Sequence, residues 1–186
     1  MKFFRVFAWD GESADERPGG PLFVPSLRQG SGRHDNPDVY TAFYASREPV
    51  SCIAEAFQPF RNQELTHRDL ERGDGLVLAL ASYELKGAAE VRDLDDPGEL
   101  SARGWRPSRV ATLDRRLTQR LAATLFEEGL SGFLWWSVLE SLWINATLFL
   151  ERVRSDLELA ESPTFLFDLD EEVEQAVRRL GIRRRW

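Results

Sequence analysis

Five polar residues, well separated along the chain, have the side-chain types that binding and catalysis most often use. They are Arg5, Arg33, Tyr44, Glu55 and Ser137. An arginine guanidinium can hold a phosphate or a carboxylate with two parallel hydrogen bonds, and a glutamate carboxylate can stabilise a developing positive charge. A tyrosine ring can stack on a planar ligand, and a serine hydroxyl can hydrogen-bond one. Each residue, taken singly, is also explained by an ordinary structural role, since solvated arginines, polar-face glutamates and turn-forming serines are common.

Nucleophilic and metal-dependent chemistry have little support in the composition. No histidine lies at an evident partnering position for Ser137, so this serine is not predicted to be a nucleophile. Cys52 is the only cysteine, which excludes an internal disulfide, and we interpret it as a small helix residue. With only His34 and His67 beside that cysteine, the chain has no thiolate or imidazole cluster for zinc. No metal is predicted, although the acidic residues leave a carboxylate-bound Mg2+ open.

Several common enzyme motifs are absent. The sequence has no Gly-x-Gly-x-x-Gly after a strand, no Gly-x-x-x-x-Gly-Lys-Ser/Thr, no Gly-x-Ser-x-Gly and no His-Glu-x-x-His. A Rossmann-type dehydrogenase, a P-loop enzyme, an α/β-hydrolase and a zinc protease are therefore disfavoured.

The charge balance argues against nucleic acids and membrane surfaces as partners. Thirty-one acidic and 24 basic residues give a net charge of −7, which repels phosphate backbones and anionic lipids. One dense basic cluster, which we interpret as a solvated helix terminus and tail, comprises Arg178, Arg179, Arg183, Arg184 and Arg185. No run of about 18 apolar residues exists, and the first residues are charged. The sequence therefore predicts a cytoplasmic protein.

The two arginines of the set are predicted to lie on a strand and on a loop. Residues 3–9 are apolar and flanked by polar residues, which indicates an opening strand that carries Arg5. Glycines, aspartate and proline in residues 29–37 indicate a loop that carries Arg33. β-Branched and aromatic residues then favour a strand over residues 39–44, which ends at the tyrosine.

The glutamate and the serine are predicted to lie on a helix and just after a strand. Pro49 and apolar residues at i, i+3, i+4 and i+7 predict a helix over residues 49–57. Glu55 lies about 150° around that helix from the apolar stripe, so it is not expected on the packed face. Residues 132–136 are apolar and aromatic and predict a strand that ends just before Ser137.

The remaining elements complete an α+β pattern. Leu113, Leu117, Leu121 and Leu125 recur every four residues and predict a helix that opens at Asp114 and ends at Gly129. The other expected elements are a surface loop over 10–25, strands over 75–82, 146–153 and 164–168, a turn at 95–98 and a closing helix over 171–180. Because strands and helices mix without a regular βαβ rhythm, the sequence predicts a single α+β domain with mixed and antiparallel sheets and flanking helices.

The order and spacing of the five polar residues resemble those of RES domains. Residues 27–37 (LRQGSGRHDNP), 40–46 (YTAFYAS) and 53–57 (IAEAF) look like the arginine-loop, tyrosine-strand and glutamate-helix block of that family. A later part of the chain is similar to the serine block and the Asn-x-x-x-Phe ending of the family. It comprises residues 119–125, Gly129, the run 132–137 (GFLWWS), Asn145 and Leu148-Phe149. The resemblance covers about residues 3–170.

The residues that carry the resemblance include the three that give the family its name. These are Arg33, Glu55 and Ser137, and Arg5 and Tyr44 match the first-strand arginine and the pocket tyrosine. Two departures lie in the arginine loop. The aromatic residue that often follows the arginine is His34 here, and the usual asparagine after it is replaced by Asp35-Asn36. Both departures bear on the shape of the loop and on the acceptor chemistry.

The resemblance implies an ADP-ribosyltransferase-like RES fold over residues 1–186, in which residues 171–186 add a helix and a basic tail. It also implies a toxin that cleaves NAD+, its substrate, at the bond between nicotinamide and ribose. Glu55 would then supply the carboxylate that stabilises the ribosyl cation, with Arg33 and Ser137 as further catalytic residues. NAD+ would be bound by Arg5, Arg33, Tyr44 and Ser137, the arginines meeting the diphosphate, the tyrosine stacking on nicotinamide and the serine bonding the ribose or orienting the glutamate.

The sequence leaves the acceptor and the partners open. Water would make the protein an NAD+ glycohydrolase, phosphate an NAD+ phosphorylase, and a protein side chain an ADP-ribosyltransferase. The resemblance implies a small Xre-type antitoxin as partner, and a homodimer is a further assembly to consider. The alternative functions are a non-enzymatic nucleotide-binding protein and an interaction module that docks through Trp135, Trp136 and Trp143, although a buried position is favoured for most of these tryptophans.

Overall fold

The computed structural model describes residues 1–13, 16–26 and 29–186, so Leu27 and Arg28 of the arginine-loop block lie outside the described residues. Contacts divide the chain into two compact units, each of which is described by itself. The first unit comprises Met1, Val24–Ala45 and Leu85–Glu158, and the second comprises Lys2–Phe23, Ser46–Glu84 and Leu159–Trp186. Of the residues of interest, Arg33, Tyr44 and Ser137 belong to the first unit, and Arg5 and Glu55 belong to the second.

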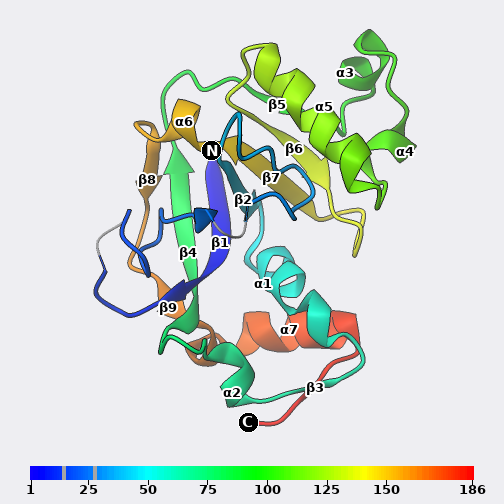
Figure 1. The fold of residues 1–186 in the computed structure, drawn as a ribbon. Helices are drawn as coiled ribbons and strands as arrows, with labels where there is room; N and C mark the ends of the chain where they lie inside the picture. Colours follow the sequence, from blue (N-terminus) through cyan, green and yellow to red (C-terminus); the bar gives the residue numbers. More distant parts are fainter. Residues whose placement is uncertain (14–15, 27–28) are drawn as a thin grey trace. The chain divides into compact units, whose positions relative to one another are not determined.

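The first unit is a mixed sheet covered by helices. Its strands are, in spatial order, β5 (Val91–Asp93), β6 (Gly132–Trp136), β7 (Ile144–Phe149) and β2 (Ala42–Ser46). Ser46, the last residue of β2, belongs to the second unit. Strand β5 pairs with β6 in parallel, and β6 pairs with β7 antiparallel. The helices are α3 (Pro97–Ala102), α4 (Pro107–Val110), α5 (Arg115–Glu127) and α6 (Leu150–Val153) (Figure 1).

Helix α5 provides the apolar face that covers this sheet. The Asp114 carboxylate accepts a hydrogen bond from the Arg116 N–H at 2.9 Å and so caps the N-terminus of the helix. Leu121 and Leu125 are fully buried in a cluster with Phe133 and other side chains of the sheet. The predicted helix is confirmed, but the prediction that Leu113 belongs to its apolar stripe is wrong. Leu113 is 79% exposed because it precedes the capping residue and does not follow the helical turn.

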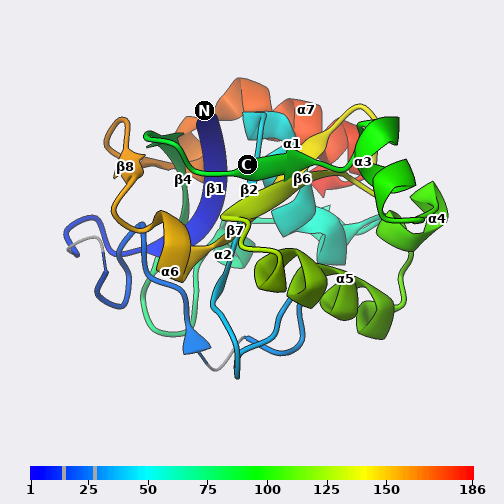
Figure 2. The same cartoon turned by 90° about the horizontal axis from the view of Figure 1, so that it is seen from above.

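The second unit contains a long antiparallel strand pair and two packed helices. Strand β1 (Lys2–Trp9) pairs along its whole length with β4 (Val77–Leu85), whose last residue belongs to the first unit, and β9 (Thr164–Phe165) pairs with β4. Phe4 of β1 also pairs with Ser46 at the end of β2. Helices α1 (Pro49–Phe57) and α7 (Asp170–Leu180) lie side by side in both views (Figure 1, Figure 2).

Short elements complete the second unit. They are the 3-10 turns at Gln58–Phe60 and Leu166–Asp168, β3 (Glu64–Leu65), α2 (His67–Leu70) and β10 (Arg183–Arg184), while β8 (Leu157–Leu159) spans the boundary between the units. Strand β10 pairs in parallel with β3. Gly181 ends α7 with a φ of 66°, a left-handed conformation that glycine adopts without a steric penalty.

Several predicted elements need correction. Residues 150–153 form helix α6 and do not continue strand β7, and residues 166–168 form a 3-10 turn after β9. Residues 39–40 precede strand β2, which begins at Ala42. The turn predicted at residues 95–98 opens helix α3, because Asp96 caps it by accepting the Gly98 N–H at 2.8 Å and Pro97 has the φ that a first helical turn requires. The α+β class with mixed sheets and flanking helices is confirmed. No helix in the part of the chain that the structure describes is long and apolar enough to cross a membrane.

The basic cluster at the C-terminal end is more ordered than a solvated tail. Arg184, whose side chain is 15% exposed, forms an ion pair with Asp170, and Arg185 pairs with Glu64 at 2.9 Å. Arg178 pairs with Glu174 on the same helix face. The prediction of a solvated tail is therefore wrong for Arg184, since a short strand and an ion pair hold its side chain in a largely buried position.

Candidate functional site

The loop that carries Arg33 is organised around a buried carboxylate. Asp35 is 3% exposed, and its carboxylate accepts hydrogen bonds from the Gly30 N–H at 2.8 Å, the Gly32 N–H at 2.5 Å and the Tyr44 hydroxyl at 2.6 Å. A Cβ on Gly32 would lie 2.6 Å from both carboxylate oxygens of Asp35. The departure from the family pattern at this position therefore determines how the loop closes.

Helix α5 holds the same loop from its other side. The Gln119 side-chain amide donates to the carbonyls of Gly30 at 3.2 Å and Gly32 at 3.0 Å. The Thr118 hydroxyl donates to the carbonyl of Arg33. Because the carbonyls of Gly30, Gly32 and Arg33 all accept hydrogen bonds from this helix, the backbone that carries the arginine is fixed.

The guanidinium of Arg33 is also fixed. One terminal nitrogen donates to the carbonyls of Thr112 at 2.6 Å and Val110 at 3.3 Å. Val110 is the last residue of helix α4, and Thr112 follows the helix. The guanidinium carbon lies 5.2 Å from the ring centroid of Trp135, within the range of a cation–π contact. The side chain is half-buried. The sequence indicated only a loop arginine, whereas the structure shows that two carbonyls and a tryptophan ring hold its guanidinium.

His34 occupies an aromatic position beside that arginine. It is 1% exposed, stacks against Tyr44 with the ring centroids 6.2 Å apart, and meets Phe133 and Trp135 edge-on at 4.9 and 5.0 Å. Its Nδ1 is hydrogen-bonded to the Thr147 hydroxyl at 2.8 Å. Burial lowers the pKa of His34 well below its usual range, and the positive charge of Arg33 lowers it further. The imidazole is therefore neutral at pH 7 and packs as an aromatic ring.

Tyr44 joins the loop to strand β2. Its hydroxyl donates to Asp35 and accepts the His34 N–H at 2.8 Å. Burial raises the pKa of Tyr44, and the hydrogen bond to Asp35 raises it further, because the bond would be lost on ionisation. Tyr44 is therefore a protonated residue that positions the loop, in addition to any contact with a ligand.

Ser137 closes the turn after strand β6. It is 2% exposed, its hydroxyl accepts the Leu139 N–H at 3.0 Å, and its own N–H donates to the Trp143 carbonyl at 2.7 Å. Trp135 and Trp143 are buried, at 6% and 7% exposure, and Trp136 packs partly buried against the core. The favoured prediction of buried tryptophans is confirmed, and the reading in which they form an exposed docking surface loses its basis.

Arg5, in the second unit, holds a loop backbone. Its guanidinium donates to the carbonyls of Pro21 at 3.1 Å and Phe23 at 3.0 Å, and the Tyr83 hydroxyl donates to the same Pro21 carbonyl at 2.6 Å. Burial lowers the pKa of Arg5, but arginine keeps its charge at neutral pH. The arginine therefore orders residues 21–23, a contact that the sequence did not reveal.

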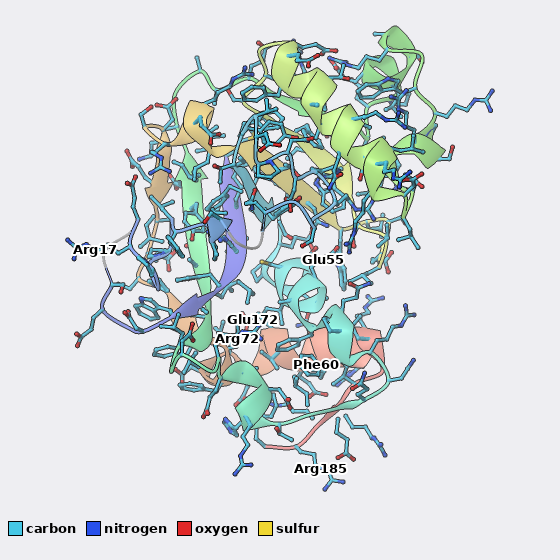
Figure 3. The ribbon with its side chains drawn as sticks, viewed as in Figure 1. Arg17, Glu55, Phe60, Arg72, Glu172 and Arg185 are labelled. Atoms are coloured by element: carbon cyan, nitrogen blue, oxygen red, sulfur yellow. The ribbon has the colours of Figure 1, made fainter. Side chains whose placement is uncertain are left out.

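Glu55, also in the second unit, lies on helix α1 (Figure 3). It is half-buried, whereas Ile53, Ala54 and Phe57 are fully buried. Cys52 lies one turn earlier, where its sulfur accepts the Val6 N–H at 3.0 Å. Burial raises the pKa of the Cys52 thiol to about 12, so the interpretation of this cysteine as a small helix residue fits its surroundings.

The structure thus brings together two of the predicted site residues with residues that were not predicted. Arg33 and Tyr44 share the loop network with His34, Asp35 and Gln119. Asp35 was visible in the sequence as a departure from the family pattern. Nothing in the sequence signalled that Gln119 clamps the loop, because that contact joins residues that are 87 positions apart.

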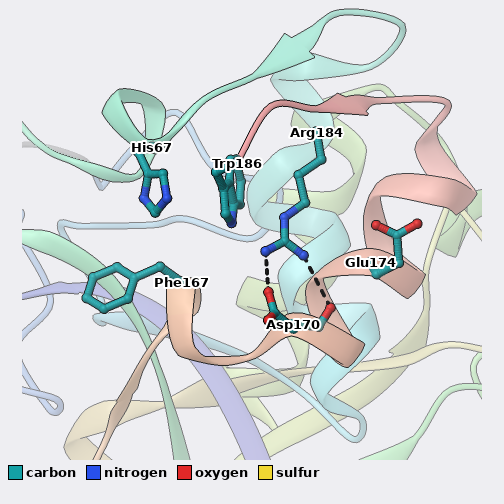
Figure 4. A pocket seen from close by; sticks show the side chains of 6 residues that line it. All are labelled: His67, Phe167, Asp170, Glu174, Arg184 and Trp186. Atoms are coloured by element: carbon teal, nitrogen blue, oxygen red, sulfur yellow. Dashed lines mark hydrogen bonds and ion pairs between the residues drawn. The ribbon is translucent and has the colours of Figure 1, made fainter.

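A cavity of about 510 Å3 lies in the second unit (Figure 4), and neither Arg5 nor Glu55 is among its lining residues. It is lined by His67, Phe167, Asp170, Glu174, Arg184 and Trp186. The arginine in this cavity is paired with Asp170, and its guanidinium lies 4.5 Å from the Trp186 ring centroid. Among the described residues, no group of three or more His, Cys, Asp and Glu side chains is arranged to hold a metal ion.

Comparisons with known proteins identify the family. The family model described as RES domain matches residues 4–170. A solved structure of the M. tuberculosis MbcT–MbcA toxin–antitoxin complex is similar, with a TM-score of 0.64 and 16% sequence identity over 93% of this chain and 88% of that chain. At this identity the likeness concerns the fold alone. Comparison with curated proteins gives no match. Since the matched residues make up most of the sequence, the chain belongs to the RES-domain family.

Proposed function

We propose that this protein cleaves NAD+ at the bond between nicotinamide and ribose. Membership of the RES-domain family supports the proposal. The observation that carries it is the arrangement of Arg33. This residue lies on the loop that Asp35 closes, and its guanidinium donates hydrogen bonds to two carbonyls outside that loop. A cation fixed before the ligand arrives can meet a diphosphate without a large cost of ordering, which is what binding without a P-loop or Rossmann cradle requires.

The proposed chemistry needs a carboxylate for the sugar. Breaking the bond to nicotinamide leaves positive charge on the ribose, and a carboxylate beside that charge stabilises the transition state more than the ground state. We assign this role to Glu55. We assign Arg33 to the diphosphate and Ser137 to a hydrogen bond with the ribose, and both complete the catalytic set.

Two further residues are proposed to bind NAD+. Tyr44 offers its ring to nicotinamide while its hydroxyl keeps the loop closed. Arg5 is assigned to NAD+ binding as well, and its hydrogen bonds to Pro21 and Phe23 support a role in positioning that segment.

The acceptor is identified by the product. Water gives ADP-ribose, nicotinamide and a proton. Inorganic phosphate gives ADP-ribose-1″-phosphate, nicotinamide and a proton, and a protein side chain gives an ADP-ribosylated protein, nicotinamide and a proton. Mass spectrometry of the reaction with and without phosphate distinguishes the three.

We also propose that the protein is the toxin of a toxin–antitoxin pair. The similar M. tuberculosis structure is of such a complex, which supports an antitoxin partner for this chain. We expect an antitoxin of the Xre type to bind the toxin and block it. Expression of the chain alone should lower cellular NAD+ before growth stops, and co-expression of a neighbouring Xre-type protein should restore both. Unchanged NAD+ during full growth would contradict the toxin assignment. Light scattering of the purified chain tests the homodimer.

The decisive experiment measures free nicotinamide after the purified protein is incubated with NAD+. The Glu55→Gln variant keeps the shape of the side chain and removes its charge, so loss of a few kcal/mol of transition-state stabilisation should lower the rate about a hundredfold or more. The melting temperature should change little. Glu172→Gln is the matched control, because Glu172 is a half-buried glutamate of helix α7 with no proposed role.

Each outcome has a defined meaning. Release of nicotinamide by the parent and the Glu172 variant but not by the Glu55 variant supports the proposal. Parental turnover in Glu55→Gln removes this residue from the mechanism. A folded parent that binds NAD+ without releasing nicotinamide is a nucleotide-binding protein and not the enzyme proposed.

A further inference from the structure

A second cavity lies in the first unit, between α4 and the first turns of α5. Its volume is about 520 Å3, and it is lined by Gly104, Arg106, Ser108, Arg109, Leu117 and Arg120. The two helices that form it are in contact (Figure 1). Among the described residues, no acidic side chain lines this cavity, and three of its lining residues are arginines.

These three arginines, unlike Arg103, have no acidic partner among the described residues. Within the described residues, Arg106, Arg109 and Arg120 form no ion pair, although the chain has a net charge of −7. Arg103, a few residues away, pairs with Glu99 at 2.5 Å and Glu128 at 2.6 Å. Like charges around one concavity repel one another, and a bound anion converts that repulsion into attraction.

The ring of Trp105 packs against the guanidinium of Arg109 and helps to position it for such an anion. Arg109 is half-buried, and its guanidinium carbon lies 5.0 Å from the ring centroid of Trp105. Its Nε is buried and makes no hydrogen bond to a described protein group. A buried N–H without an acceptor costs stability, and an oxygen from a ligand would satisfy it.

The cavity in the second unit provides an internal contrast. There the single arginine, Arg184, is paired with Asp170, and Glu174 adds a further carboxylate. The arginine of that cavity therefore already has a carboxylate partner within the protein. In the cavity of the first unit, the polar side chains of the lining are three arginines and Ser108.

We propose that the cavity lined by Arg106, Arg109 and Arg120 binds a phosphate group, either free or carried by a small molecule. A phosphate has a charge close to −2 and several acceptor oxygens, which suit three guanidinium forks and a hydroxyl better than a single carboxylate does. The cavity has a volume of about 520 Å3, a size that suits a small phosphate compound. The proposal does not depend on NAD+ cleavage.

The test is a calorimetric titration of the full chain at low ionic strength with inorganic phosphate, pyrophosphate and AMP, in a buffer without phosphate. Arg106→Gln and Arg120→Gln remove charge from exposed side chains and should leave folding intact. Each is expected to weaken binding of the phosphate probes at least tenfold. Arg116→Gln, which changes an exposed arginine of α5 outside the cavity, should change the affinity less than twofold. Arg109→Gln is tested alongside, with its melting temperature, because that side chain also packs on Trp105.

The outcomes separate the sources of the phosphate. Equal binding of all three probes identifies a free phosphate group as sufficient, whereas binding of AMP alone identifies a phosphate ester, and both support the site. No saturable binding of any probe overturns the proposal. An equal loss of affinity in Arg116→Gln and the cavity variants also overturns it, because it shows attraction to the general charge of the surface. Binding of only an acidic polypeptide would overturn it in favour of a protein partner.

Discussion

His34 is expected to make stability depend on pH between 5 and 7. The imidazole is fully buried among Tyr44, Phe133 and Trp135, and burial lowers its pKa well below the usual range. In the unfolded chain the same imidazole has a pKa of about 6.5. We therefore compare the parent with His34→Phe, which keeps an aromatic ring and removes the titration.

The sign follows from the protons that each state binds. Below about pH 6.5 the unfolded state takes up a proton that the folded state does not, so the free energy of unfolding falls as the pH falls. Above that pH neither state is protonated and the contribution is constant. The slope approaches about 1.4 kcal/mol per pH unit, which amounts to about 2 kcal/mol between pH 6.5 and pH 5. Loss of the hydrogen bond to Thr147 shifts the whole curve of the variant without adding a slope.

Urea unfolding at 25 °C, measured from pH 5 to pH 8 in half-unit steps, gives the free energy of unfolding of both proteins. The difference between parent and His34→Phe should change by about 2 kcal/mol over the lower part of this range and stay flat above pH 7. Asp10, whose pKa hydrogen bonds lower to about 2, titrates below this window in the folded state and is common to both proteins. Parallel curves over the whole range would refute the reasoning, because they would show that His34 can bind a proton in the folded state.

Other changes test the loop and the thiol. Gly32→Ala should destabilise the protein by about 1–3 kcal/mol in urea unfolding because its Cβ would collide with the Asp35 carboxylate, whereas Gly73→Ala, which meets nothing within 4 Å, should be near neutral. Asp35→Asn should cost about 2–4 kcal/mol in the same assay, since it weakens three charge-assisted hydrogen bonds; an unchanged free energy would show that the carboxylate does not close the loop. Arg33→Ala should weaken NAD+ binding about tenfold or more by calorimetry and also lower stability by about 1–2 kcal/mol, because two carbonyls lose their donor; equal NAD+ affinity would remove Arg33 from the site. Cys52, buried and with its pKa raised to about 12, should react with iodoacetamide far more slowly in the native protein than in urea, and equal rates would contradict the assigned burial.

The sequence by itself determined the elements whose signals are local. Helix α1 begins at the proline and ends where its apolar period ends, and α5 begins after its capping aspartate. Strand β6 coincides with the predicted residues 132–136. The order and spacing of polar residues also pointed to the RES family, because spacing along the chain reflects a shared framework. The element boundaries depend on residues within a few positions of one another, whereas the family resemblance depends on residue types spaced along most of the chain. A single sequence displays both.

Tertiary contacts decided the features that join distant residues. The three residues of β5 form a strand only because β6 pairs with them. Residues 150–153 form a helix although they follow directly on the apolar residues of strand β7. Asp35 became the centre of the arginine loop through Tyr44 and two glycine N–H groups. The neutral state of His34 follows from its burial against Phe133, Trp135, Thr147 and the half-buried Tyr44. Burial and hydrogen-bond partners are properties of the packed structure. Composition and spacing could therefore indicate candidate site residues. They could not indicate which residues hold the others in place.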